Sequence, residues 1–156
     1  MSLGMGSPKC RRGGAGRAAP LAVKRVEPGL VLLLPDQWVF AASGTDRRTL
    51  GVDAAALPRQ SRHYFLCVAT TPEGDRSDWI ATTSKHRVGC FLIPEVHKDG
   101  YPPWVGRDSF CKVERVYRLE TTALEPWVVD GASARRNFVG ERAVEELAWC
   151  ITDWAS

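Results

Sequence analysis

Short apolar runs, separated by turn residues, recur along the middle of the chain. Five of them have the length of a β-strand: residues 30–34, 63–69, 79–83, 88–93 and 109–119. Turn-rich text such as "TTPEGDRSD" and "HKDGYPPWVGRD" lies between them, and its Gly, Pro and Asp residues favour turns and loops. The last run alternates between apolar and charged residues, which is typical of a strand with one face in the core. The pattern predicts a small, mostly antiparallel β-barrel or curled sheet.

The pattern is weaker in three places. Pro35 and Asp36 favour a turn, and "QWVFAAS" after them is predicted as the returning strand of a hairpin. Residues 44–60 fit no regular element. Arg115 falls on the apolar face of the last run, which predicts either a bulge at this point or an arginine that reaches into a polar cavity.

The chain ends in a segment with helical periodicity. Between residues 139 and 154, four apolar residues recur at helical spacing: Val144, Leu147, Ile151 and Trp154. Glutamates near the start of the segment suit the helix dipole. We expect this helix to pack on the sheet, and core packing to account for Trp149 and Trp154. The fold class is therefore mostly β, α+β overall, with a single domain over residues 27–156.

The basic residues gather at the start of the chain. The net charge is +3, and residues 1–25 contain six Lys or Arg residues and no acid, so the rest of the chain is net −3. We expect residues 1–26 to be a disordered basic tail. Such a tail can neutralise phosphates, although a solvated leader or a start codon placed too early is the simpler explanation and is preferred.

Five cysteines are widely spaced and form no C-x-x-C pair. Three of them, Cys67, Cys90 and Cys111, lie in apolar runs, where a reduced thiol behaves as a small hydrophobic group. This usage indicates a reducing compartment. The longest apolar run is too short to span a bilayer, and no secretory signal is visible. We therefore expect a cytoplasmic protein that has no membrane association, no metal site and no cofactor.

The most polar stretch begins in the last two residues of the third run. Residues 82–87, "TTSKHR", all carry a hydroxyl, a positive charge or an imidazole. Such side chains can bind phosphate, and Lys85, His86 and Arg87 are candidates for RNA contacts. A solvated turn between two strands explains the same residues.

The order of these pieces resembles the PemK/MazF-like superfamily. An arginine opens an apolar strand in "RHYFLCV", the next strand ends in Thr-Thr in "IATTSK", and a serine leads a later strand in "DSFCKVERVYRL". The resemblance covers about residues 28–120. It implies an SH3-like barrel and, as in many members, a sequence-specific endoribonuclease that is the toxin of a toxin–antitoxin pair. A partner antitoxin, a homodimer and single-stranded RNA as substrate are implied with it.

Carried over by position, the resemblance places the cleavage site at Arg62 and Thr82, with Thr83 as the alternative. A guanidinium and a hydroxyl can stabilise the charge that develops on phosphorus when the 2′-hydroxyl attacks. His63 or His86 can transfer the proton, and His86 is preferred because strand alternation turns His63 away from Arg62.

Other residues are candidates for RNA contacts outside the cleavage step. Trp104, in a loop with Tyr101, is a candidate for stacking on unpaired bases, although packing within the loop explains it as well. Arg115 is a further RNA-binding candidate if it reaches a polar cavity.

The chain also departs from the family pattern. His63 stands where members commonly have proline, and 27 residues separate Leu34 from Arg62. These departures favour the alternative reading, a non-catalytic interaction or nucleic-acid-binding barrel that has lost the ribonuclease site.

Overall fold

Eight short strands make up most of the described chain. The computed structural model describes residues 26–44, 61–86, 88–130 and 137–151. The strands are β1 (Leu30–Pro35), β2 (Arg62–Thr70), β3 (Arg76–Thr83), β4 (Cys90–Ile93), β5 (Lys98–Asp99), β6 (Ser109–Lys112), β7 (Tyr117–Glu120) and β8 (Asn137–Val139). Two α-helices, α1 (Asp36–Ala42) and α2 (Glu141–Ala148), join them, together with the short helical turns η4 (Glu95–His97), η5 (Thr121–Leu124) and η6 (Pro126–Asp130).

The strands form one antiparallel sheet that curls into a nearly closed barrel. Its order is β4-β6-β3-β2-β1-β8-β5, with β7 pairing with the first half of β3. The two edge strands, β4 and β5, are consecutive in the chain and are joined by Pro94 and η4. This short connection keeps the two edges of the sheet near each other. The structure thus confirms the predicted antiparallel barrel with a C-terminal helix.

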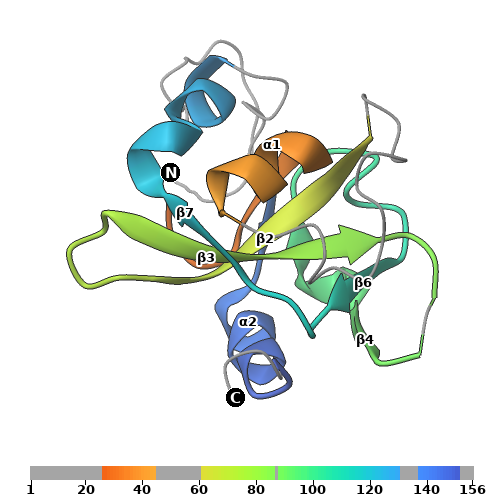
Figure 1. Ribbon diagram of the computed structural model, residues 1–156. Helices are drawn as coiled ribbons and strands as arrows, with labels where there is room; N and C mark the ends of the chain where they lie inside the picture. Colours follow the sequence, from red (N-terminus) through yellow and green to blue (C-terminus); the bar gives the residue numbers. More distant parts are fainter. Residues whose placement is uncertain (1–25, 45–60, 87, 131–136, 152–156) are drawn as a thin grey trace, which may run out of the picture.

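Strand β1 is buried on both faces, as a continuous apolar run predicts. Leu30, Leu32 and Leu34 belong to one buried cluster, whereas Val31 belongs to another with Leu66. The first cluster is covered by α1 and by the segment from β7 to η6, and the second by α2 and Trp104. Figure 1 shows α1 on one side of the sheet and α2 on the other.

The predicted hairpin after β1 is wrong. Residues 36–42 form helix α1, and the strand that returns along β1 is β2, which pairs with it from Val31↔Leu66 to Pro35↔Arg62. Pro35 caps the helix in an extended conformation, and Asp36 is the acid in its first turn. An acid at this position is a helix-start signal, which a reading of Pro-Asp as a turn overlooks.

The predicted strand over 109–119 is two strands, β6 and β7, with a turn at 113–116. Strand β6 pairs with the end of β3 and β7 with its start. Arg115 lies in the turn between them and is half-buried. Its misfit with strand alternation therefore marks the end of β6, not a bulge within a longer strand.

Helix α2 is shorter than the predicted 139–154. It ends at Ala148, and its buried side chains are Ala143, Val144 and Leu147. Trp149, predicted to pack in the core, is 90% exposed. Trp154, the predicted basic tail and residues 45–60 lie outside the described residues. None of the described helices is both long enough and apolar enough to cross a membrane.

Candidate functional site

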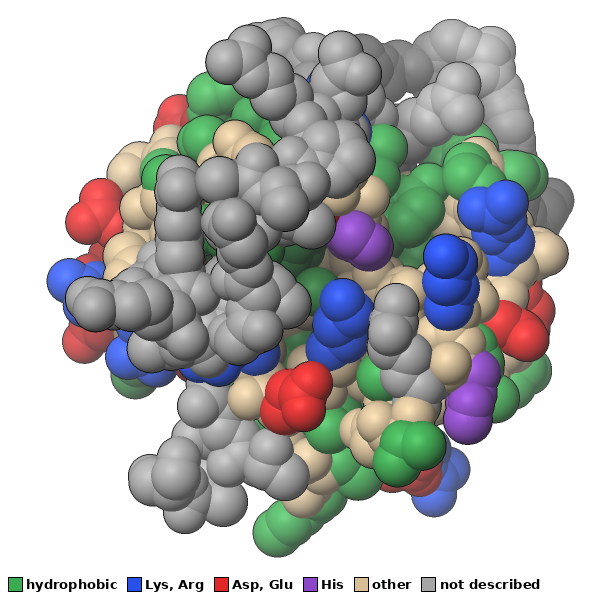
Figure 2. Space-filling model, turned by 45° about the vertical axis from the view of Figure 1, so that its right-hand side comes forward, with side chains coloured by type: hydrophobic (Ala, Val, Ile, Leu, Met, Phe, Trp, Pro, Cys, Tyr) green, Lys and Arg blue, Asp and Glu red, His purple; other side chains and the backbone are tan. Residues whose placement is uncertain are grey.

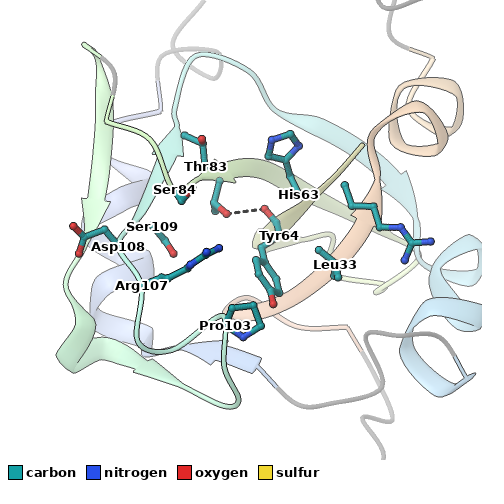
Figure 3. A pocket seen from close by; sticks show the side chains of 11 residues that line it. Leu33, His63, Tyr64, Thr83, Ser84, Pro103, Arg107, Asp108 and Ser109 are labelled. Atoms are coloured by element: carbon teal, nitrogen blue, oxygen red, sulfur yellow. Dashed lines mark hydrogen bonds between the residues drawn. The ribbon is translucent and has the colours of Figure 1, made fainter. Parts of the chain in front are cut away.

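A cleft of about 270 Å³ opens at one end of the sheet. Its lining comes from strand ends and the loop before β6: Leu33, Arg62, His63, Tyr64, Thr82, Thr83, Ser84, Pro103, Arg107, Asp108 and Ser109. Figure 3 shows these side chains around the opening, with that of Arg107 extending into it. Ligand sites usually measure about 300–1,000 Å³, so this cleft suits a small group.

Two arginines are among the residues that line this cleft. Arg62 opens β2 and Arg107 lies in the loop before β6, and both residues are exposed. Among the residues that the structure describes, neither side chain forms an ion pair. On the face that Figure 2 turns forward, Lys and Arg side chains lie beside a histidine. An arginine without an acidic partner can bind a phosphate with two parallel hydrogen bonds.

The two predicted threonines differ in what their hydroxyls do. Thr82 is buried, and its hydroxyl donates a hydrogen bond of 2.9 Å to the carbonyl oxygen of Tyr64. Thr83 is half-buried, and its oxygen accepts a hydrogen bond of 3.2 Å from the backbone N–H of Lys85. The proton of Thr83 thus has no acceptor within the described part of the chain. Thr83, the alternative in the sequence prediction, is the threonine able to donate to a ligand.

His63 is held by a buried carboxylate. Its Nδ1 lies 2.8 Å from Oδ1 and 2.9 Å from Oδ2 of Asp36, and the hydroxyl of Ser61 donates to Oδ2 over 2.6 Å. Burial alone would raise the pKa of Asp36, but the hydrogen bonds from His63 and Ser61 outweigh it and lower that pKa below its ordinary value. Asp36 is therefore ionised at neutral pH.

The loop that carries Arg107 is organised around Lys98. The side chain of Lys98 is 0% exposed, and its ammonium donates to Trp104 O over 2.9 Å, to Ser109 Oγ over 2.8 Å and to Arg107 O. It also lies 3.3 Å from Glu95 Oε1 and 4.5 Å from the centre of the Trp104 ring. A buried ammonium is tolerated only with such partners. Here Trp104 and Arg107 lie in the loop, Ser109 begins β6 and Glu95 lies in η4.

Glu95 closes the same loop from outside. Its Oε2 accepts a hydrogen bond of 2.6 Å from the backbone N–H of Gly106. This bond, with a smaller effect from Lys98, lowers the pKa of the Glu95 carboxyl. Arg107 and Ser109 are thus presented to the cleft by a loop with fixed internal hydrogen bonds.

Several predicted site residues lie elsewhere. His86 and Lys85 are exposed in the turn after β3, and the His86 ring meets Phe110 edge-on at 5.3 Å. Neither lines the cleft, and neither does Arg115. Arg87 is outside the described residues.

The prediction that Trp104 stacks on bases is wrong. Its ring is 0% exposed and contacts Tyr64 at 5.3 Å between ring centres. Packing within the loop, the alternative explanation, accounts for it.

Sequence reasoning missed three groups at this site. It took Asp36 for a turn residue and gave Arg107 and Lys98 no role. It also placed His63 and Arg62 on opposite faces of β2, whereas both line the cleft because the cleft lies at the strand end, where both faces contribute. Two features of the sequence could have pointed to the Asp36 and His63 contact: an acid at a helix start and a histidine two residues after a serine. Nothing in the sequence marks Lys98.

The part of the chain that the structure describes contains no group of three His, Cys, Asp or Glu side chains that could hold a metal ion.

Comparison with protein-family models, with curated proteins and with solved structures finds no match to the chain.

Proposed function

We propose that this protein binds single-stranded RNA in the cleft and cleaves it through the RNA's own 2′-hydroxyl. The observation that carries the proposal is the pair of arginines, Arg62 and Arg107, that line one small cleft with no ion-pair partner among the described residues. Two arginines and a threonine hydroxyl at one cleft suit a phosphodiester and the extra charge that it gains in the transition state.

RNA is the favoured substrate because it carries its own nucleophile. Attack of the 2′-hydroxyl on the adjacent phosphorus needs charge stabilisation and proton transfer, and side chains can supply both. In this cleft, Arg62, Arg107 and Thr83 would hold the phosphate oxygens. The reaction then requires no metal ion.

The resemblance to the PemK/MazF-like superfamily supports the same function. Arg62 and Thr83, two of the residues that it singles out, line the cleft together. An endoribonuclease toxin that pairs with an antitoxin and forms a homodimer is the specific form of this proposal. The alternative is a non-catalytic interaction or nucleic-acid-binding barrel. It rests on His63 in place of the common proline and on the 27 residues between Leu34 and Arg62.

The products of the reaction test the proposal. Purified protein is incubated with a long single-stranded RNA of mixed sequence in EDTA, beside the same RNA with 2′-O-methyl groups. We expect cuts that leave 2′,3′-cyclic phosphate and 5′-hydroxyl ends in the first RNA and none in the second. Binding without cleavage would support the alternative, and absence of both would overturn the proposal.

A further inference from the structure

Asp36, Ser61 and His63 meet because of the register between β1 and β2. Pro35 pairs with Arg62 and Leu34 with His63, so Asp36, the next residue after β1, lies opposite Ser61. The backbone N–H of Asp36 donates to the carbonyl oxygen of Ser61 over 2.9 Å. Ser61 and His63 are two residues apart along an extended chain and share a face. Both side chains therefore reach the same carboxylate.

The carboxylate fixes the tautomer of His63. An ionised carboxylate only accepts hydrogen bonds, so Nδ1 of His63 must carry the proton in its bond to Asp36. In the neutral imidazole this leaves Nε2 as a free lone pair, that is, a proton acceptor. His63 lines the cleft with 34% of its side chain exposed, and Nε2 has no partner within the described residues.

We propose that His63 is the catalytic base of the cleft and that Asp36 is the residue that positions it; this role rests on the proposed function above. Nε2 of His63 accepts the proton of the 2′-hydroxyl while the 2′-oxygen forms its bond to phosphorus. The bond from phosphorus to the 5′-oxygen breaks, and the leaving oxygen takes a proton from water. The protonated imidazole later returns its proton to solvent.

His86 provides the contrast. Its ring packs against Phe110, and no carboxylate bonds to it among the described residues. Nothing there fixes its tautomer or directs a nitrogen at the cleft. The two histidines thus form a matched pair, one oriented by a buried acid and one not.

Chemical rescue tests the role of His63. Single-turnover cleavage of RNA is measured for wild type, His63→Ala and His86→Ala, with thermal unfolding to confirm that each is folded. We expect His63→Ala to lose about 10²- to 10⁴-fold in rate, the usual contribution of a general base, and His86→Ala to lose nothing. Added imidazole should restore part of the rate in His63→Ala, and more as pH rises and free base accumulates.

Asp36→Asn tests positioning. The asparagine amide can donate to Nδ1 and so stabilise the opposite tautomer, with the proton on Nε2. We expect the rate to fall at all pH values and imidazole to restore nothing, because His63 still occupies its place. The imidazole bonds to Asp36 of α1, and Arg62 of β2 and Arg107 and Asp108 of the loop line the same cleft. Lys112 of β6 acts on Asp36. All of these charges contribute to the pH profile of each variant.

The outcomes separate the two proposals. A wild-type protein that cleaves RNA, with His63→Ala folded and equally active, would overturn the role of His63 and leave the ribonuclease proposal standing. Loss of activity in His63→Ala without rescue by imidazole would also overturn it, since a positioning or packing effect would then explain the loss. A wild-type protein that does not cleave RNA would overturn the proposed function, and the role of His63 with it.

Discussion

The hydroxyl of Thr82 donates its proton to the carbonyl oxygen of Tyr64, 2.9 Å away on the neighbouring strand. This bond uses the proton that a phosphate would need. The adjacent Thr83 keeps its proton free of the described residues. The hydroxyl of Thr82 is therefore structural, whereas the hydroxyl of Thr83 is available to a ligand.

Replacing each threonine by valine tests this difference. We expect Thr82→Val to lower the free energy of unfolding by about 1 kcal/mol, the usual net effect of one hydrogen bond. Thr83→Val should leave stability nearly unchanged but slow RNA cleavage about ten- to a hundredfold, because hydrogen bonds to charged groups contribute about 1.5–3 kcal/mol. Urea unfolding and single-turnover cleavage measure both. A larger loss of activity in Thr82→Val than in an equally folded Thr83→Val would contradict the assignment.

Lys98→Met should weaken both the loop and the cleft. The variant leaves the oxygens of Trp104, Arg107 and Ser109 without their shared donor, which costs about 1–3 kcal/mol of stability. It should also weaken RNA binding, because Arg107 is no longer held in place. Lys85→Met, at an exposed lysine outside the cleft, is the control, with a stability change within about 0.5 kcal/mol. Equal effects of the two substitutions on stability would show that Lys98 does not organise the loop.

Gly29 is required where β1 meets β8. It has a φ of +102°, and a Cβ there would lie 2.7 Å from the carbonyl oxygen of Val139. Gly74 has a φ of +78° but open space around it, so both glycine-to-alanine changes strain the backbone and only Gly29→Ala adds a clash. We expect Gly29→Ala to be less stable than Gly74→Ala by about 1–3 kcal/mol, as for other forced overlaps. Similar unfolding midpoints would contradict this contact.

Asp36 should contribute to stability in a pH-dependent way. The pKa of Asp36 is lowered in the folded protein, and the unfolded value is about 3.9. Its contribution is therefore fully present above about pH 4 and is lost as the pH falls through the folded pKa. Asp36→Asn should be less stable than wild type at pH 6, and the difference should narrow toward pH 3. A difference that is constant between these pH values, measured by urea unfolding, would exclude the linkage.

The sequence predicts the barrel well because its strands are marked by local chemistry. Residues 30–34 are apolar on both faces, and turn residues separate β2 from β3. These strands can therefore be identified from the local sequence without knowledge of distant contacts. The helix α1 was missed because "QWVFAA" suits a strand as well as a helix. In the structure this segment is a helix whose first residue, Asp36, bonds to Ser61 and His63.

The candidate site is less predictable because its groups meet through tertiary contacts. Arg62, Thr82 and Thr83 came from the family resemblance and do line the cleft. Arg107 lies in a loop that Lys98 joins through hydrogen bonds to Trp104, Arg107 and Ser109. These tertiary contacts leave no periodic pattern in the sequence. His63 was set aside because strand alternation puts it on the other face of β2 from Arg62, yet both residues line the cleft, which lies where β2 begins.

The most direct test compares the two cleft arginines with an arginine elsewhere. Arg142 is exposed on α2 and does not line the cleft, so Arg142→Ala is the control for Arg62→Ala and Arg107→Ala. Single-turnover cleavage of one labelled single-stranded RNA is measured in EDTA, with thermal unfolding of all four proteins. We expect both cleft variants to remain folded and to lose at least about 10²-fold in rate, while Arg142→Ala cleaves like wild type. Equal rates in all four proteins, or no cleavage by wild type, would contradict the assignment of this cleft as a ribonuclease site.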